Sequence, residues 1–415
     1  MDAKLRTVLD AGEPAPYPSL LMMRATPTTE ETARTWADID LDRIAANVET
    51  LRAQLPVAAE ILMPVKANAY GHGLVPVAAV ARSAGVWGLG VASLDEAAAL
   101  RAADISGPVV CLMPILPGEA KRAIALEITV AITDWPQVEA LAAAATAAGK
   151  TTPVHVEVDT GMGRSGAWDR DAAQLIESAH KLPSIEVEGI FTHFASADER
   201  ERAPTERQLD RFDAMLKELA ERGIRPPWIH AANSAAALRF RRATRTLVRP
   251  GIVVYGSAEE IAPDTDFESG NDGRAFDAQA FEPALSWHAR VTAVKTLAAG
   301  ESVSYHRRYI ARGLERIAVL GVGYGDGWPF SLSDRGHVLL RGRRMPIRGA
   351  VCMDLTMVDA TPFPDLEVGE IATLIGCQGD EVQTVAAVGR EANLMSYAVF
   401  TGISQRVRRC YKRGS

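Results

Sequence analysis

The sequence predicts an α/β protein in which a (β/α)8 barrel, similar to a TIM barrel, is followed by a mostly antiparallel β domain. Between residues 36 and 256, eight short apolar runs alternate with longer stretches of helical character. Alternating strands and helices form a parallel sheet, and eight such units close into a barrel. After residue 282 the pattern changes to short alternating segments separated by Gly, Asp and Pro, as in antiparallel sheets.

The apolar runs are nearly evenly spaced, which favours a closed barrel over a doubly wound open sheet. Stretches such as 93–103, 135–149 and 206–223 carry helical patterns, and several end at a glycine that suits a helix C-cap. The eight expected strands are 61–65, 87–92, 109–113, 129–133, 154–158, 187–194, 228–232 and 248–256.

Two segments outside this pattern set the expected domain boundaries. Residues 1–35 hold several prolines and are expected to form a tail or arm. Residues 257–282 are acidic and lack a hydrophobic period, so we expect a linker or surface insertion. The barrel would then span 36–256 and the β domain 283–415. The N-terminus has no apolar run of signal-peptide length and the chain has none that could span a membrane, so we expect a cytoplasmic protein.

Composition narrows the class of function. With 45 Lys and Arg against 52 Asp and Glu, the 415-residue chain has a net charge of −7. Binders of nucleic acids and anionic membranes carry basic surfaces, so neither partner is expected. Hydrophobic residues make up 47% and charged residues 23%, which excludes a wholly disordered chain. The four cysteines are too far apart for a zinc-binding pattern, and no metal site is predicted.

The first candidate for chemistry is Lys66, directly after the first expected strand. Active sites of such barrels lie at the C-terminal ends of the strands. A lysine at a strand end is typically a solvated surface residue. A lysine beside a buried strand can instead lose its solvent, which lowers its pKa and suits it to Schiff-base formation and proton transfer.

The string VKANAYGHG at 65–73 resembles the pyridoxal-phosphate-dependent alanine racemases, whose cofactor lysine lies in this motif. The resemblance extends from about residue 36 to the C-terminus and recurs at several separate motifs. It implies a cofactor-binding (β/α)8 barrel followed by a β domain, in agreement with the pattern above. It also implies that Lys66 binds pyridoxal 5′-phosphate covalently and acts as one of two catalytic bases, while Tyr70 hydrogen-bonds the cofactor phosphate.

The fifth strand leads into DTGMGRSG at 159–166, which contains a GxGxxG pattern. We do not expect a dinucleotide site, because that pattern normally follows the first strand of its domain and not the fifth of eight. The resemblance implies instead that Arg164 approaches the cofactor's phenolic oxygen and the substrate carboxylate. Glu157 stands where many relatives have a lysine, carbamylated in some, that orients this arginine. We hypothesise that Glu157 pairs with Arg164 directly; the alternative is a side chain that faces solvent or another partner.

Two loops are expected to bind the cofactor phosphate. They follow the seventh and eighth strands, where phosphate sites of such barrels are frequently built. Backbone N–H groups of Ser234, Gly251 and Ile252, together with the Ser234 hydroxyl, can donate to phosphate oxygens. Asn233 precedes Ser234 and belongs to the same expected site. Taken alone, Asn-Ser is also a common turn or cap, and Arg-Pro-Gly a common surface turn.

The resemblance gives His193 and Arg249 further roles at the cofactor. His193 would lie against the cofactor and link to the second catalytic tyrosine, although a lone histidine at a strand end is more often structural. Arg249 would place its guanidinium at the pyridine nitrogen. Because a guanidinium is permanently charged and only donates, that nitrogen would stay unprotonated and the ring would be a weaker electron sink. Catalysis would then depend on well-placed bases.

The second base is expected from the β domain. By resemblance, Tyr305 of one subunit completes the site of the other, opposite Lys66, which requires a homodimer with shared active sites. Racemisation needs one base on each face of the substrate, because one removes the α-proton and the other returns a proton. Tyr324 and Met353 would bind the substrate across the dimer, and Tyr397 would contact the phosphate and narrow the pocket. Each of these side chains taken alone would be typical of a β-domain core or surface.

These implications favour a racemase that interconverts L-alanine and D-alanine and supplies D-alanine for peptidoglycan. A bulky residue at Tyr397 favours alanine over serine. The alternatives are a serine or broad-spectrum amino-acid racemase, an amino-acid decarboxylase of similar architecture, and a non-catalytic pyridoxal-phosphate-binding protein. A decarboxylase would not need a tyrosine opposite the lysine, and the non-catalytic barrel proteins lack the β domain that carries Tyr305 and Met353.

Overall fold

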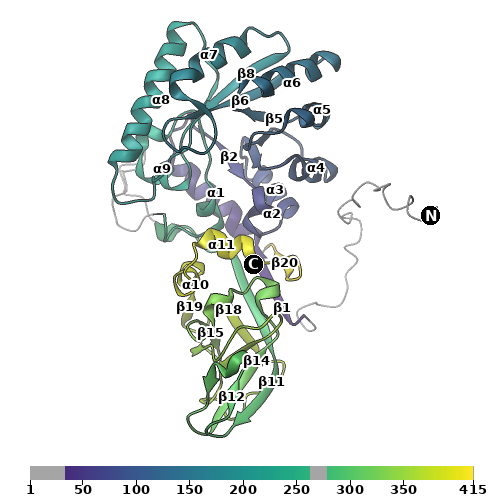
Figure 1. Ribbon diagram of the computed structural model, residues 1–415, viewed down its shortest axis with the longest axis vertical. Helices are drawn as coiled ribbons and strands as arrows, with labels where there is room; N and C mark the ends of the chain where they lie inside the picture. The colour runs from purple at the N-terminus through teal and green to yellow at the C-terminus, as the bar shows by residue number, and fades with distance from the viewer. Residues whose placement is uncertain (1–32, 262–277, 415) are drawn as a thin grey trace, which may run out of the picture.

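The computed structural model describes residues 33–261 and 278–414, and these form a barrel and a second sheet that stack end to end (Figure 1). Most of the expected N-terminal tail, residues 1–32, and the centre of the expected insertion, residues 262–277, lie outside the described residues, as does Ser415. Within the described part of the chain, no helix is both long enough and apolar enough to cross a membrane.

Eight parallel strands form the barrel, one at each of the expected apolar runs. The eighth run is predicted as a strand over 248–256, but the strand ends at Val248 and Ile252–Tyr255 form a 3-10 helix. From β2 to β9 each strand pairs with the next along the ring, and β10 pairs with β2. The remaining gap, between β9 and β10, is bridged by Arg249 N, which donates to Ala232 O at 2.9 Å. The strands are β2 (Glu60–Pro64), β3 (Gly88–Val91), β4 (Val109–Cys111), β5 (Thr129–Ile132), β6 (Thr152–Asp159), β8 (Ile185–Phe191), β9 (Trp228–His230) and β10 (Leu247–Val248), with the short β7 (Ala167–Trp168) beside β6.

Helices form the outer layer of the barrel (Figure 1). The three predicted helical stretches are confirmed as α4, α6 and α8. Ser93 caps α4 by accepting from Glu96 N at 3.2 Å, and Asp134 caps α6 by accepting from Gln137 N at 3.1 Å. The elements are α1 (Leu41–Gln54), α2 (Lys66–Tyr70), α3 (Leu74–Ser83), α4 (Leu94–Ala102), α5 (Ala120–Ala125), α6 (Trp135–Ala147), α7 (Asp169–His180), α8 (Ala203–Glu221), α9 (Ser234–Arg239) and the 3-10 helix η5 (Ile252–Tyr255).

The second sheet is mostly antiparallel, as predicted. The long strand β11 (Leu285–Leu297) runs through it and pairs with β14 and β18. In its core, Trp287 and Trp328 meet edge to face with ring centroids 5.6 Å apart. β12 (Ser302–Val303) and β13 (Tyr309–Ile310) form a separate two-stranded sheet. The other elements of this part of the chain are β14 (Glu315–Leu320), β15 (His337–Leu340), β16 (Arg343–Pro346), β17 (Thr356–Asp359), β18 (Ile371–Gln378), β19 (Glu381–Gln383), α10 (Val385–Ala392), α11 (Ser396–Gly402) and β20 (Arg408–Lys412).

The first strand, β1 (Thr35–Asp40), lies in this second sheet and not in the barrel. It pairs antiparallel with β11 and parallel with β20. This corrects the expected start of the barrel at residue 36. The chain enters the barrel at Asp40, whose carboxylate caps α1 by accepting from Arg43 N at 3.0 Å. A strand that runs straight into a helix has the same local pattern in either sheet, so periodicity alone could not assign it.

The C-terminal elements return to the barrel at the loop that follows β2. Arg409, in β20, donates from Nε to Gly71 O at 3.0 Å. A side chain at Gly71 would place its Cβ 2.2 Å from Phe400 O in α11, and the φ of 81° at this position also favours glycine. α11 and β20 therefore pack against the loop that carries Lys66.

Candidate active site

Lys66 opens a short left-handed turn at the C-terminal end of β2. The next four residues, Ala67, Asn68, Ala69 and Tyr70, have φ values of 53°, 55°, 51° and 52°. Left-handed backbone costs roughly 1–2 kcal/mol per residue for L-amino acids. Four such residues in succession persist only where the surroundings fix them, and strain of this kind is concentrated at functional sites.

Side chains from neighbouring segments fix this turn. Glu96, in α4, accepts from Ala67 N at 2.6 Å through Oε1 and from Ala92 N at 2.8 Å through Oε2. Asn68 Oδ1 accepts from Leu74 N at 2.8 Å. The turn is thereby tied to the end of the adjacent strand β3 and to the start of α3, so the lysine projects from a rigid support.

The Lys66 amine is half-buried in the field of two arginines. Burial lowers its pKa, and the charges of Arg164 and Arg249 lower the pKa further, while Glu96 and Glu157 oppose this shift. A lowered pKa increases the fraction of neutral amine at a given pH. The neutral amine is the form that acts as a nucleophile or a base.

Arg249 is buried directly after β10 and is surrounded by acceptors. Nη1 donates to Nδ1 of His230 at 2.9 Å and to the His230 carbonyl at 3.0 Å. Nη2 donates to Thr192 O at 2.8 Å and to Nδ1 of His193 at 3.1 Å. Burial lowers the pKa of Arg249 to about 10, so the guanidinium stays charged at neutral pH. The site therefore holds a fixed cation that can only donate.

His193 faces this arginine as an acceptor. Burial lowers the pKa of His193 well below its ordinary value, and the charges of Arg249, Arg164 and Lys66 act in the same direction. The ring is therefore neutral at pH 7, with Nδ1 accepting and Nε2 protonated. Its carbonyl accepts from Gln208 Nε2 at 3.0 Å, which fixes the backbone after β8.

The residues expected to bind phosphate lie at the starts of two short helices. Ser234 begins α9, and Ile252 begins η5. The first N–H groups of a helix have no partner within it, so both starts can donate to an anion. Ser234 Oγ accepts from Gly251 N at 2.8 Å and so joins the two segments. Asn233 caps α9 by accepting from Ala236 N at 2.9 Å, so its side chain stabilises the start of α9. We call the adjoining starts of α9 and η5 the phosphate corner.

The Tyr70 side chain also reaches the phosphate corner. A side chain at Gly251 would place its Cβ 2.6 Å from Tyr70 Oη, so the absence of a side chain leaves room for this hydroxyl. The Tyr70 ring stacks on Tyr255 with centroids 4.9 Å apart and lies 6.0 Å from the ring of Tyr397 in α11. Burial raises the pKa of Tyr70 to about 12 and also raises the pKa of Tyr397. Both hydroxyls are therefore protonated at neutral pH and can donate.

The glycine-rich loop after β6 is organised around Asp159. Oδ1 accepts from Gly161 N at 2.8 Å and Met162 N at 2.9 Å, and Oδ2 accepts from Gly163 N at 2.8 Å. The N–H groups that would bind a dinucleotide phosphate are thus bonded to a carboxylate of the chain itself. The glycines serve a tight turn that presents Arg164, in agreement with the rejection of a nucleotide site.

Glu157 lies beside Arg164, as hypothesised. Arg164 Nη2 is 3.9 Å from Glu157 Oε1, and Ser165 Oγ donates to Oε2 at 2.8 Å. Glu157 is only 3% exposed, which excludes the solvent-facing alternative. Burial raises the pKa of this carboxyl, while the Ser165 hydrogen bond and the Arg164 charge oppose that shift.

Three other expected residues lie away from the barrel, on the β domain. Tyr305 is 65% exposed, Tyr324 is 44% exposed and Met353 is 53% exposed. Figure 1 shows β12, which leads into Tyr305, at the end of the molecule opposite the barrel. The structure of one chain therefore does not bring Tyr305 to the amine of Lys66.

The loops that carry these three residues are joined to one another. Ser304 Oγ donates to Ala350 O at 2.7 Å and links the Tyr305 loop to the Met353 loop. Gly325 N donates to Met353 O at 2.8 Å and links the Tyr324 loop to the same segment. We call these three loops, with Tyr305, Tyr324 and Met353, the tyrosine face.

Several side chains that shape the site were not predicted. Asp159 could have been recognised, because an aspartate before a glycine-rich turn commonly accepts from its N–H groups. Tyr255 ends the eighth apolar run, and His230 lies inside the seventh, but their places in the runs say nothing about their contacts. Glu96 lies in a helix far from Lys66 in sequence, and no local pattern singles it out.

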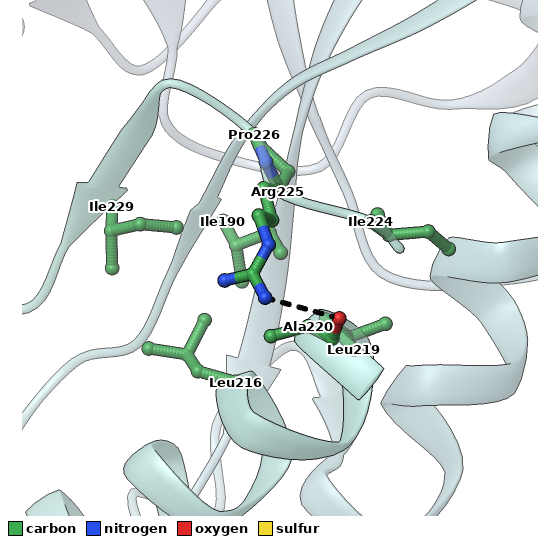
Figure 2. Close-up of a pocket in the computed structure, with 8 residues that line it drawn as sticks. All are labelled: Ile190, Leu216, Leu219, Ala220, Ile224, Arg225, Pro226 and Ile229. Atoms are coloured by element: carbon green, nitrogen blue, oxygen red, sulfur yellow. Dashed lines mark hydrogen bonds between the residues drawn. The ribbon is translucent and has the colours of Figure 1, made fainter. Parts of the chain in front are cut away.

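An apolar cavity lies elsewhere, between α8 and the strands β8 and β9 (Figure 2). Arg225 is the one charged residue that lines it, and its Nη2 donates to Ala220 O at 3.4 Å. None of the candidate residues reaches this cavity, so it is separate from the site at Lys66. Its lining residues are Ile190, Leu216, Leu219, Ala220, Ile224, Arg225, Pro226 and Ile229.

Known proteins match both parts of the chain. Residues 39–259 match the family "Alanine racemase, N-terminal domain", and residues 284–411 match "Alanine racemase, C-terminal domain". An alanine racemase of Symbiobacterium thermophilum is 42% identical over 91% of this chain and 97% of its own length.

Solved structures match over nearly the whole chain. The alanine racemase of a D-cycloserine-producing Streptomyces lavendulae superposes with a TM-score of 0.84 at 36% identity, covering 94% of this chain and 99% of the other. That of Bartonella henselae, solved with covalently bound pyridoxal phosphate, superposes with a TM-score of 0.80 at 26% identity, covering 92% and 100%. The matched segments contain every candidate residue of the barrel and of the tyrosine face. The two family matches, the identity to known alanine racemases over nearly the whole chain and the shared two-part fold mean that this chain belongs to the alanine racemase family.

Proposed function

We propose that this protein is an enzyme that interconverts L-alanine and D-alanine with pyridoxal 5′-phosphate. The observation that carries the proposal is the half-buried Lys66 at the C-terminal end of the barrel, near enough to Arg164 and Arg249 for their charges to lower the pKa of its amine. The alanine racemases to which the chain is similar, one of them solved with pyridoxal phosphate, support the same substrate and cofactor. When bound, the cofactor supplies an electron-withdrawing ring that makes the α-proton of the attached amino acid removable.

The residues present fit this cofactor. The Tyr70 hydroxyl and the starts of α9 and η5 offer donors for a phosphate, and Gly251 adds no side chain that would fill that corner. Arg249 offers a fixed donor to the pyridine nitrogen. Lys66 offers an amine of lowered pKa for the covalent link.

The barrel residues then have distinct roles. Lys66 moves the proton at the substrate Cα on one face, because its lowered pKa makes the amine available as a base. Arg164 binds the substrate carboxylate, and the buried Glu157 supplies a counter-charge behind it. His193 accepts from Arg249 and keeps that guanidinium oriented.

The second base is Tyr305 of another copy, so the active form is a homodimer. Racemisation needs a proton donor on the face opposite the lysine. An exposed cluster of Tyr305, Tyr324 and Met353 on joined loops is unusual for a monomer surface and suits a self-complementary contact. Tyr324 and Met353 would then contact the substrate from the same side as Tyr305.

Two observations favour alanine racemisation over the alternatives. The half-buried Tyr397 ring beside Tyr70 narrows the site, which supports alanine over serine or a broad substrate range. The tyrosine face supports a racemase over a decarboxylase or a non-catalytic carrier of the cofactor, neither of which needs a second base. We propose further that the enzyme acts in the cytoplasm and supplies D-alanine for peptidoglycan.

The test is α-proton exchange in deuterated water with purified, cofactor-loaded protein. L-alanine and D-alanine should each gain deuterium at Cα and lose optical rotation. Equal exchange of serine would indicate a broad-spectrum racemase, and release of carbon dioxide would indicate a decarboxylase. A cofactor absorbance band without exchange of any amino acid would contradict the proposal.

A further inference from the structure

A series of hydrogen-bonded polar side chains begins at Arg249 in the candidate active site and leads from there through the interior of the barrel. It starts at Arg249, whose Nη1 donates to His230 Nδ1 at 2.9 Å. His230 Nε2 lies 2.9 Å from His155 Nδ1, and His155 Nε2 lies 3.3 Å from Glu188 Oε2. Glu188 Oε2 also accepts from Thr129 Oγ1 at 3.3 Å, at the first residue of β5. The series therefore runs from the C-terminal towards the N-terminal ends of the strands.

The surrounding backbone accommodates these side chains. His155 and His230 are both 0% exposed in an interior that is normally filled by branched apolar residues. A Cβ at Gly189 would lie 2.6 Å from the His155 ring, so only glycine leaves room for the imidazole. Between β6 and β8, Val154 pairs with Val187 and His155 pairs with Gly189, so Glu188 is the extra residue of a β-bulge. Bulges re-aim side chains and are frequent near functional sites.

As long as Arg249 Nη1 donates to His230, the hydrogen-bond donors in this series can point in one direction only. A guanidinium has no acceptor, so His230 Nδ1 must accept from Arg249. Burial lowers the pKa of both His230 and His155, so both rings are neutral and each carries one proton. His230 must then donate from Nε2 to His155 Nδ1, and His155 must donate from Nε2 to Glu188. The reverse arrangement would set an N–H of His230 against an N–H of Arg249.

We propose that His155 and Glu188 are positioning residues that fix the tautomer of His230 and, through it, the orientation of the Arg249 guanidinium. The inference rests on the proposed function, because Arg249 matters there as the partner of the pyridine nitrogen. Glu188 provides the terminal acceptor, and its side chain is still 24% exposed at the far end of the series. The side chains that orient Arg249 therefore extend through the barrel to its opposite end.

The test uses the full-length holoenzyme labelled with 15N-histidine. Solid-state 15N NMR distinguishes the two neutral tautomers of each ring, and each signal is assigned from a variant that lacks that histidine. In the unsubstituted protein, His155 and His230 should both carry the proton on Nε2. In His155→Phe, the His230 Nε2–H has no acceptor. Arg249 Nη1 should then leave His230 Nδ1 and keep only the His230 carbonyl, which it meets at 3.0 Å, so a population with the proton on Nδ1 should appear.

The matched control is His155→Gln. Its amide can accept from His230 and donate to Glu188, so the original tautomer of His230 should be retained. The turnover number for alanine should fall about tenfold in His155→Phe with little change in KM, because His155 acts on Arg249 only through His230. It should recover in His155→Gln. An unchanged His230 tautomer in His155→Phe would overturn the proposal, whatever happens to activity.

A second pair of variants applies if His155→Phe does not fold. Glu188→Gln keeps an acceptor for His155, whereas Glu188→Leu removes it. The proposal predicts an altered His155 tautomer in Glu188→Leu and the original one in Glu188→Gln. Identical tautomers in both would overturn it. Because the NMR signals do not depend on turnover, failure of the protein to racemise alanine would contradict the proposed function without affecting this test.

Discussion

Arg164 Nη2 lies 3.9 Å from Glu157 Oε1, and Ser165 Oγ donates to the other oxygen of the same carboxylate at 2.8 Å. The Arg164 side chain is 44% exposed, whereas that of Glu157 is 4% exposed. A buried anion of the chain itself therefore stands behind a guanidinium that is accessible to a substrate. A carbamylated lysine, which some relatives have at this position, is therefore not needed here to supply the negative charge.

Replacing Glu157 by glutamine should weaken the binding of alanine. Glu157→Gln retains the size of the side chain and an acceptor for Ser165 but removes the charge that faces Arg164. We expect KM for alanine to rise about fivefold, the equivalent of about 1 kcal/mol for a partly exposed ion pair. Steady-state kinetics with both enantiomers measures this. Glu186→Gln, at an exposed position on β8, is the control and should leave KM unchanged. Equal KM values in all three proteins would show that the ion pair of Glu157 and Arg164 does not contribute to substrate binding.

The same carboxyl should make substrate affinity depend on pH. Burial raises the pKa of Glu157. As the pH falls through that raised pKa, the carboxylate gains a proton and Arg164 loses its counter-charge, so KM should increase in mild acid. Above that pKa the pair is intact. Glu157→Gln has no proton to gain, so the difference in KM between the two proteins should shrink as the pH falls. A constant difference across the range would argue against the assignment.

A methyl group at Gly251 should weaken cofactor binding. Its Cβ would lie 2.6 Å from Tyr70 Oη. Overpacking of this kind costs about 1–3 kcal/mol, so we expect the Kd for pyridoxal phosphate to rise roughly tenfold or more in Gly251→Ala. Titration of the cofactor-free protein, followed by visible absorbance, gives the Kd. Gly118→Ala, where a Cβ meets nothing within 4 Å, is the control. Equal Kd values would show that Tyr70 and Gly251 do not shape the phosphate site.

Removing the Tyr305 hydroxyl should affect the two enantiomers unequally. In a two-base site, each base takes the α-proton from one enantiomer, so Tyr305→Phe should slow α-proton exchange from one of them much more than from the other. Lys66 would still act on the opposite face. Deuterium incorporation measured separately for L-alanine and D-alanine tests this. Tyr309→Phe, whose hydroxyl donates to Glu315 at 2.7 Å within the β domain, is the control. Equal losses for both enantiomers would contradict the assignment of Tyr305 as one of two bases.

The fold could be predicted from the sequence because eight apolar runs alternate with helices. Seven runs became strands at or near their expected positions, since buried parallel strands need continuous apolar segments. The eighth run begins with the short strand β10 and continues as the 3-10 helix η5. The error concerned β1, whose residues Trp36, Ala37 and Ile39 are buried in the second sheet. Their partners in β11 and β20 come from much later in the chain, and local patterns do not reveal such pairings.

The candidate site was only partly predictable for a similar reason. Motifs indicated Lys66, Arg164 and Arg249, because each lies at a strand end in a recognisable string. The contacts that orient them come from residues such as Glu96 and His155, which lie within a helix and a strand without a local signal. Hydrogen-bond partners across a barrel depend on the register of its strands, and a sequence pattern does not specify register to within one residue.

The measurement that tests the central claim most directly is complementation between two inactive variants. Lys66→Ala and Tyr305→Phe chains, each inactive or strongly impaired alone, are co-expressed with different affinity tags and the heterodimer is isolated. In a symmetric dimer with shared sites, one of its two sites then contains both Lys66 and Tyr305. We predict that the purified heterodimer regains about half of the activity of the unsubstituted dimer, as expected for one intact site of two. A verified heterodimer with no more activity than the two parent variants would contradict a racemase site built from two copies of this chain.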